Sequence, residues 1–211
     1  MSSLSYLKKV SPDTLLKPSA PTFLEVVNPL TLSKKELLAY KQAKKNAFMT
    51  YHQDPVNQDK ISFTAANYYA AFQAELEKHA KNTAKQYMLS AKNSVTMQVQ
   101  GGLFGEYISI NIPSLPKTEY ATITYVFVEP HAQHQGIGTL LVQFFLEHTK
   151  SHPALLAVRH THTIARKLYE KCGFTLITEP NNPTGQGCQA VVSLLNGPGY
   201  RPEEFVAYYK K

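Results

Sequence analysis

Apolar residues along this chain fall into short runs that are separated by polar, glycine-rich or proline-rich stretches. Runs of about four to eight residues, rich in β-branched or aromatic side chains and bounded by turn residues, are typical of strands. The predicted strands are residues 22–27, 86–91, 96–99, 107–112, 121–128, 155–158, 174–178 and 190–195. Gly101, Gly102 and Gly105 interrupt the pattern between two of these runs. Residues 96–112 therefore form either one bent or bulged strand or two strands.

Four other segments have apolar positions at helical spacing. Ser33 and Glu36 form a capping-box pattern, which predicts a helix from there to about Tyr51. A second helix is predicted over residues 62–81. Two more are predicted over residues 138–150 and 162–171, each between two predicted strands. Strands followed by strand–helix alternation after residue 120 favour a mixed α/β sheet.

The length of 211 residues suits one domain with extensions. We expect residues 1–20 to form a flexible leader and residues 21–200 to form a single domain. The tail, residues 201–211, is expected to add a helical turn or to extend freely. No internal repeat is visible, which argues against a tandem arrangement of two copies.

The loop between residues 128 and 139 has the features of a phosphate-binding site. It joins an apolar strand to a helix and contains Gly136 and Gly138. Backbone N–H groups in the first turn of a helix lack internal partners and favour anions, and glycines let a phosphate approach closely. The loop lacks the third glycine of a dinucleotide fingerprint, because position 141 is Leu141, and it lacks the lysine of a nucleotide P-loop.

The spacing Gln133-x-x-Gly136-x-Gly138 resembles the acetyl-CoA pyrophosphate loop of the GNAT N-acetyltransferases. A second segment, residues 165–174 (ARKLYEKCGF), is similar to a helix and turn of the same family. The two motifs stand in the expected order, and the resemblance extends over roughly residues 86–180. It implies the GNAT fold, a mixed and mostly antiparallel central sheet with splayed parallel central strands and flanking helices. The co-substrate would lie in the gap between the splayed strands.

The resemblance also implies roles for individual residues. Tyr169 matches the tyrosine that serves as general acid, whereas the alternative is an ordinary buried helix tyrosine. Gln133 would brace the loop, backbone N–H groups of residues 135–139 would hold the pyrophosphate, and His134 either contacts a phosphate or faces solvent. The residues expected to bind acetyl-CoA are Phe127, Val128, Gln133, His134, Gln135, Gly136, Ile137, Gly138, Thr139, His162 and Ala165.

The sequence departs from the family pattern at two positions. His162 stands where an asparagine often contacts pantetheine, and Thr122 stands where some relatives have a catalytic carboxylate. The candidates for the general base are therefore Glu106, Glu119, Tyr125 or a water chain, and Glu129 is as well explained by a surface position. His160 and His162 lack further ligands, so we expect no metal site.

Charge and cysteine content indicate the kind of partner and the cellular compartment. The net charge of +7 and the pI near 9.2 favour anionic partners, which include a CoA-like polyanion. The basic cluster Lys34, Lys35, Lys41, Lys44 and Lys45 is expected to be a solvated helix face rather than a nucleic-acid footprint. The two cysteines do not have the spacing of metal ligands, which predicts free thiols in a reducing compartment. The chain has no apolar core of signal-peptide length, so we expect a cytoplasmic location. Its apolar runs are too short to span a membrane, so we expect no membrane partner.

The resemblance implies an enzyme that transfers acetyl from acetyl-CoA to a primary amine by direct attack in a ternary complex. The acceptor is left open among a small molecule, a peptide and a protein lysine. Tyr40, Tyr51, Tyr68, Tyr69 and Phe72 would form either an aromatic acceptor groove or core. The alternative function is a catalytically silent CoA-binding module that acts through protein partners. We expect a monomer or a homodimer.

Overall fold

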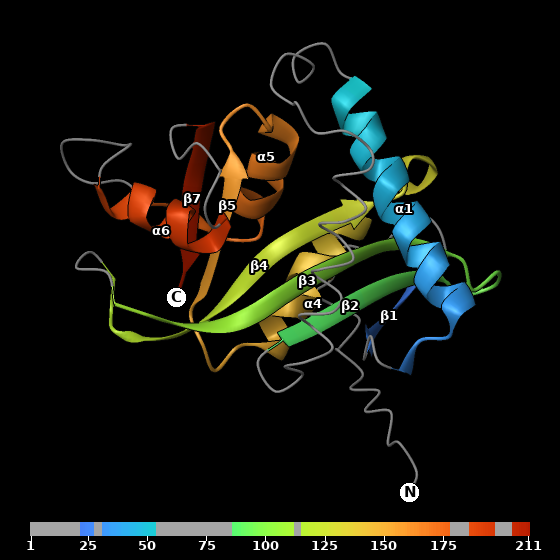
Figure 1. Cartoon of the computed structure of the whole chain (residues 1–211), viewed down its shortest axis with the longest axis horizontal. Coiled ribbons are helices and arrows are strands. Elements are labelled where there is room, and N and C mark those ends of the chain that lie inside the picture. The colour runs from blue at the N-terminus through green and yellow to red at the C-terminus, as the bar shows by residue number, and fades with distance from the viewer. Residues whose placement is uncertain (1–21, 28–30, 54–85, 112–114, 178–185, 197–203) are drawn as a thin grey trace, which may run out of the picture.

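The computed structural model describes residues 22–27, 31–53, 86–111, 115–177, 186–196 and 204–211 (Figure 1). The strands are β1 (Thr22–Val27), β2 (Gln86–Asn93), β3 (Val99–Ile110), β4 (Thr118–Val128), β5 (Ala154–Arg159), β6 (Thr175–Leu176) and β7 (Phe205–Lys210). The helices are α1 (Lys34–Gln53), α4 (Ile137–His148), α5 (Thr163–Lys171) and α6 (Gln186–Asn196), with a short 3₁₀ turn η2 (Pro130–Ala132).

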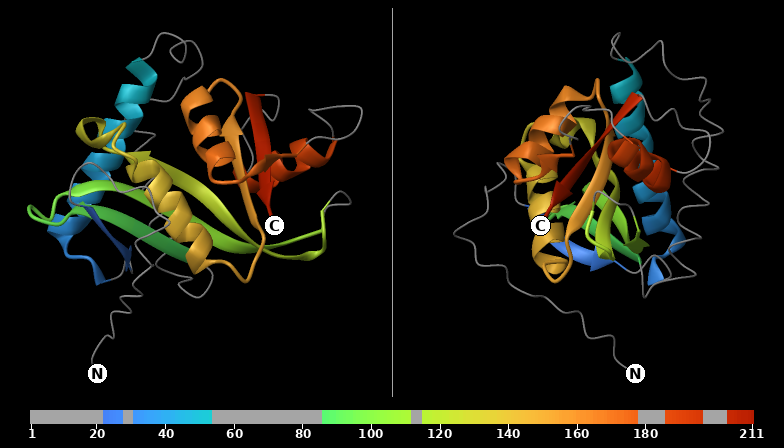
Figure 2. Two further views of the ribbon diagram at one scale, coloured as in Figure 1. Left: turned by 180° about the vertical axis from the view of Figure 1, so that it is seen from behind. Right: turned by 90° about the vertical axis from the view of Figure 1, so that its left-hand side faces the viewer.

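The strands form one sheet in the order β1-β2-β3-β4-β5-β7-β6. Only the central pair β4 and β5 is parallel among the described strands, and every other neighbouring pair is antiparallel. Helices α1 and α6 lie on one face of the sheet, and α4 and α5 lie on the other (Figures 1 and 2). The predicted mixed, mostly antiparallel sheet with flanking helices is confirmed.

The two parallel strands separate soon after they meet. They pair at only three positions, of which the last is Ile123 opposite Leu156, although β4 continues to Val128 and β5 to Arg159. We call the point beyond the Ile123–Leu156 pair the fork. Past the fork, no strand among the described residues pairs with this edge of β4, so its backbone groups can serve another partner.

A bulge on β4 lies directly at the fork. Phe104 pairs with Tyr125 and Gly105 pairs with Ile123, which leaves Thr124 without an opposite residue on β3. Gly105 allows a close approach here, because a Cβ at this position would collide with the Thr122 carbonyl oxygen and the Tyr87 ring. The Tyr87 hydroxyl donates a hydrogen bond to that same carbonyl. Residues 99–110 themselves form one continuous strand, β3, with a bulge at Gln100, because Ala91 pairs with Gly101 and Lys92 pairs with Val99.

The hydrophobic core differs between the two faces of the sheet. On the α4 side, one cluster spans both sides of the fork and includes Leu89, Leu141, Phe145, Leu156 and Tyr208. On the other face the core is divided. One cluster lies under α1 around Phe104 and Phe127, and a second lies under α6 around Tyr120, Leu155 and Val192.

Most of the predicted elements are confirmed. Strand β1 has the predicted bounds, and α1 begins with the predicted capping box. The Ser33 N–H and hydroxyl donate to the Glu36 carboxylate at 2.9 and 2.7 Å, and the Glu36 N–H donates to the Ser33 hydroxyl at 3.2 Å. Within the described ranges no helix is long and apolar enough to cross a membrane.

Three predictions are wrong. Residues 190–195 belong to helix α6 and not to a strand, because a short apolar run alone does not distinguish the two. The tail is neither free nor helical, since Phe205–Lys210 forms β7 and pairs with β5 and β6. Residues 96–98 precede β3 instead of forming a strand with Val99. The predicted helix over residues 62–81 and the leader, residues 1–20, lie outside the described residues.

Replacement of Gly105 by alanine should destabilise the fold. The added methyl group would meet backbone and a buried ring, neither of which can yield, and overpacking of this kind costs about 1–3 kcal/mol. Urea denaturation should therefore show a lower midpoint for Gly105→Ala. The control Ser109→Ala, at an exposed position of the same strand, should stay within about 0.5 kcal/mol of wild type. Equal midpoints for the two variants would contradict this account of the bulge.

Candidate functional site

The open edge of β4 is the first component of the site. The Glu129 N–H donates to the Gln100 carbonyl on the β3 side at 2.8 Å. Because backbone groups alternate along a strand, the N–H and C=O of Val128 point away from β3, to the open edge. The Phe127 carbonyl instead lies against β3, since a Cβ on Gly101 would stand 2.7 Å from its oxygen. Of the two residues predicted to pair with pantetheine, Val128 thus presents its backbone to the gap.

The loop that follows is held by side chains of its own. Gln133 Nε2 donates to the Val128 carbonyl at 3.1 Å, and Gln135 Nε2 donates to the His131 carbonyl at 2.9 Å. His134 has a φ of 60° and is exposed, and Gly136 has a φ of 82°. These two left-handed residues turn the chain sharply into α4. The bond from Gln133 agrees with the bracing role expected of it.

Helix α4 begins directly after this turn and presents its N–H groups there. Gly136 is its N-cap, and no side chain caps the first turn. The N–H groups of Ile137, Gly138 and Thr139 therefore have no partner within the helix. Ile137 and Thr139 are themselves buried and anchor the turn. A Cβ at Gly136 would meet nothing within 4 Å, so space lies open before these N–H groups, as an incoming phosphate would require.

A buried carboxylate ties the loop to α1. Glu129 is 8% exposed, and Asn46 Nδ2 donates to its two carboxylate oxygens at 3.1 and 3.2 Å. Burial raises the pKa of Glu129, and the Asn46 hydrogen bond only partly opposes that rise. A surface position, one of the alternatives for Glu129, is therefore wrong. No sequence pattern indicated a role for Asn46, because its partner lies 83 residues away.

Helix α5 brings Tyr169 to the other side of the gap. Its ring packs against Phe174 and Tyr208, with centroids 5.9 and 6.5 Å apart. Burial, with a smaller effect of the nearby Cys172, raises the pKa of Tyr169 well above that of a free phenol. The hydroxyl is therefore protonated throughout the physiological range. Burial also raises the pKa of Cys172 to about 11, so this thiol is unreactive at neutral pH.

The remaining predicted residues lie along the start of α5. His162 is the N-cap of this helix, and burial lowers the pKa of its imidazole, which is consequently neutral at pH 7. Ala165 is partly buried against the hydrophobic cluster on the α4 side of the sheet. A Cβ at Gly138 would lie 3.6 Å from the Leu168 side chain and 3.7 Å from that of Val128. The end of β4, the start of α4 and helix α5 thus meet at Gly138.

A polar hollow opens at the fork on the opposite face of the sheet. It is lined by Glu106, Thr122, Ile123, Thr124, Ala157 and Leu195. Glu106 of β3 lies directly opposite Thr122 of β4 in the register. Sequence reasoning named Glu106 as one of several candidates, and the register now brings it to the position where the carboxylate on β4 is missing.

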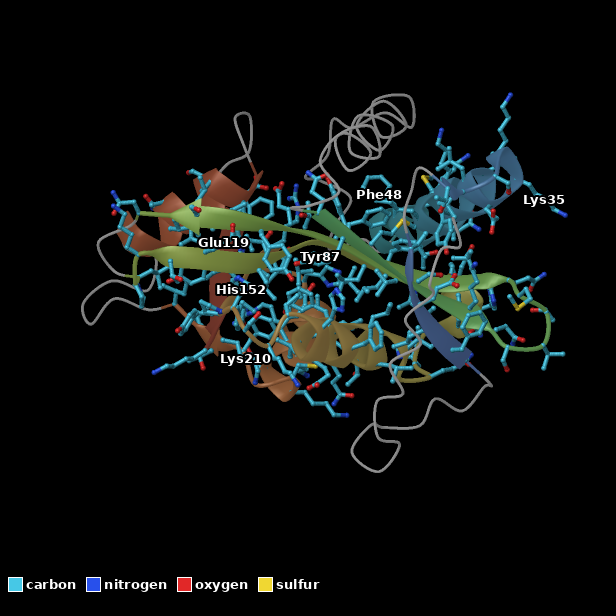
Figure 3. The ribbon with its side chains drawn as sticks, turned by 90° about the horizontal axis from the view of Figure 1, so that it is seen from below. Lys35, Phe48, Tyr87, Glu119, His152 and Lys210 are labelled. Carbon is cyan, nitrogen blue, oxygen red and sulfur yellow. The ribbon has the colours of Figure 1, made fainter. Side chains whose placement is uncertain are left out.

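Other candidates lie elsewhere. Glu119 contacts His152 at 3.4 Å, and both lie on the side of the molecule away from Lys35 (Figure 3). The Tyr125 ring lies under the Lys44 ammonium at 3.6 Å from the ring centroid. Lys44 is 5% exposed, so it does not belong to the predicted solvated face. Tyr40 is core, with its hydroxyl 2.5 Å from Ser90 Oγ. The side chains of Tyr51, Tyr68, Tyr69 and Phe72 lie outside the described residues.

Known proteins share both the sequence pattern and the fold. Residues 62–174 match the family model of the acetyltransferase (GNAT) family, which is more than half of the 211-residue chain. No curated protein matches the chain significantly.

Two solved structures illustrate the shared fold. The PaiA N-acetyltransferase of Thermoplasma acidophilum, solved in complex with coenzyme A, superposes with a TM-score of 0.55 at 12% identity, over 90% of this chain and 99% of that chain. PH1933 from Pyrococcus horikoshii OT3 gives a TM-score of 0.53 at 16% identity, over 90% of this chain and 98% of that chain.

The buried carboxylate of Glu129 should make stability depend on pH in a defined direction. Its pKa is raised above the ordinary value of 4.5, so folding favours the protonated form. Its ionisation costs stability as the pH rises through the raised pKa, and that cost is absent below the pKa of the unfolded chain. The gain in unfolding free energy from Glu129→Gln should therefore be larger at neutral than at acidic pH, as measured by urea denaturation.

Glu36 provides the matched control. Hydrogen bonds from Ser33 lower its pKa, so Glu36→Gln should lose stability at neutral pH and approach wild type in acid. If the curves of wild type and Glu129→Gln ran parallel over the whole pH range, the assigned burial penalty would be wrong.

Proposed function

Because this chain belongs to the GNAT family of acetyltransferases, we propose that it transfers the acetyl group of acetyl-CoA to a primary amine by direct attack within a ternary complex. The observation that carries the proposal is the fork, where the open edge of β4 leads into the glycine turn of α4. An extended ligand arm needs such an edge, and a diphosphate needs such a turn. The acceptor is a small molecule, a peptide or a protein lysine.

Acetyl-CoA would be held mainly by backbone. The N–H groups of residues 135–139 would bind the pyrophosphate, and the Val128 N–H at the open edge would donate to the pantetheine arm. Gln133 keeps the loop in place through its bond to the Val128 carbonyl. His162 and Ala165 would border the arm from α5, and exposed His134 would approach a phosphate. The net charge of +7 assists the capture of this polyanion.

Tyr169 is proposed as the general acid. Its protonated hydroxyl would donate to the sulfur as the thiolate departs, which spares the enzyme from releasing an unprotonated leaving group. Among the described residues no hydrogen bond holds this hydroxyl, whereas the neighbouring Tyr208 hydroxyl is fixed between Arg166 and Glu170. Tyr169 is thus able to turn its proton to an incoming group.

The alternative is a silent module that binds CoA and acts through protein partners. The absence of a carboxylate at Thr122 favours it, and the retention of Tyr169 favours the enzyme. Isothermal titration with acetyl-CoA, followed by thiol release in the presence of primary amines, separates the two. Binding with turnover supports the enzyme, binding without turnover supports the silent module, and no binding contradicts both.

The two loop glycines should respond differently to the same substitution. Gly136→Ala places a side chain at a φ of 82°, in the open space before the helix N–H groups, and a left-handed residue costs about 1–2 kcal/mol. Acetyl-CoA affinity should fall about tenfold or more in calorimetry. Gly138→Ala meets only ordinary contacts at 3.6 Å and beyond, so its affinity should stay close to wild type. Equal affinities for both variants would contradict the loop assignment.

Tyr169→Phe should slow turnover and leave acetyl-CoA affinity nearly unchanged. Loss of a general acid typically costs about 10²–10⁴ in rate, and an interaction made in the transition state appears in kcat. Thiol release with methoxyamine and calorimetry provide the two measurements. The control Tyr120→Phe removes a hydroxyl that donates to the Pro116 carbonyl at 2.6 Å, and it should keep its rate. A normal rate for Tyr169→Phe would assign this residue to packing alone.

A further inference from the structure

The polar hollow lies between the two hydrophobic clusters on one face of the sheet. Along β3, Phe104 packs in the cluster under α1 and Ile108 packs against the cluster under α6. Glu106 lies between them on the same face, because side chains two apart share a face of a strand. A carboxylate at the junction of two hydrophobic clusters is costly unless a partner compensates for its burial.

Neighbouring groups fix Glu106 at the fork. Gln86 Nε2 donates to its carboxylate at 3.3 Å, and the Thr122 hydroxyl donates to its backbone carbonyl at 2.9 Å. Thr122 and Thr124 line the hollow beside it, and Ala157 contributes from β5. The carboxylate is half-buried and is the only charged group among the described residues that line the hollow.

We infer that Glu106 receives the ammonium of the acceptor and takes its proton before the attack on the thioester. The inference rests on the proposed function. It assigns to β3 the carboxylate that the sequence lacks at Thr122 on β4, across a single register pair. It also defines the acceptor class, which is an alkyl primary amine that carries a positive charge in solution.

The other two side chains considered as the general base, Glu119 and Tyr125, lie outside the hollow. Glu119 pairs with Ser109 near the start of β4 and contacts His152. Tyr125 does not line the hollow, and its ring is covered by the Lys44 ammonium. Among the three side chains considered for the base, Glu106 alone lies in the hollow where β4 and β5 separate.

The proton and bond changes balance as follows. The Glu106 carboxylate accepts one proton from the ammonium, and the neutral nitrogen attacks the thioester carbonyl carbon. A C–N bond forms, the C–S bond breaks, and the sulfur leaves with a proton, which Tyr169 provides. Tyr169 regains its proton from the attacking nitrogen as the amide forms. Glu106 releases its proton to water, so the net products are the amide, the free thiol and one proton.

Ethylamine and methoxyamine separate a base from a merely structural carboxylate. The two molecules have nearly the same shape, but at pH 7 ethylamine is an ammonium and methoxyamine is neutral. Glu106→Gln should lower kcat/KM for ethylamine by about 10²-fold or more. Its kcat/KM for methoxyamine should change by less than about threefold, because no proton has to be removed first. Acetyl-CoA affinity, measured by calorimetry, should be unchanged.

Two further variants sharpen the test. Glu119→Gln makes the same chemical change outside the hollow and should leave both rates unaltered. The double variant Glu106→Gln with Thr122→Glu moves the carboxylate across the register pair. Its kcat/KM for ethylamine should be at least about tenfold higher than that of Glu106→Gln alone. Equal losses with both amines, or no loss with ethylamine, would overturn the role of Glu106. If wild type bound acetyl-CoA but released no thiol with either amine or with a lysine-containing peptide, the proposed function itself would fail.

Discussion

The structure depends on the early end of pairing between β4 and β5. Three residue pairs hold these parallel strands together, and beyond them the backbone of β4 has to find other partners. Gln133 satisfies the Val128 carbonyl, and the bulge at Thr124 turns the strand where the separation begins. The loop, the helix N-terminus and the hollow are all arranged around this one interruption of an otherwise continuous sheet.

The two faces of the sheet make different contributions at the fork. On the α4 side a continuous core crosses the interruption and keeps the two halves of the sheet in register. On the other face the core is divided, and the space between its parts is polar. Asn46 and Glu129 join helix α1 to the loop across this face. A change at α1 can therefore reach the loop through a single pair of side chains.

The sequence predicted what local patterns encode. The capping box at Ser33, the glycine loop and the Tyr169 motif each lie within about ten residues, and the structure contains all three elements. Residues 190–195 were misassigned because an apolar run bounded by turn residues suits a buried strand and a helix equally. Strand β7 was missed, although its Phe-Val-Ala-Tyr-Tyr content favours a strand. The Glu106–Thr122 and Asn46–Glu129 pairs depend on register and packing, which single-sequence patterns do not contain.

The short pairing between β4 and β5 affects how local stability is distributed over the sheet. Amide hydrogens near Ile123 and Leu156 should exchange with solvent more readily than those of the long β3–β4 ladder, because few neighbouring bonds protect them. A ligand that spans the gap between β4 and β5 would contact the parts of the sheet on both sides of the fork and hold them together. Its binding would slow exchange in β5 and β7 as well as in β4, because it would add contacts between the two sides of the fork.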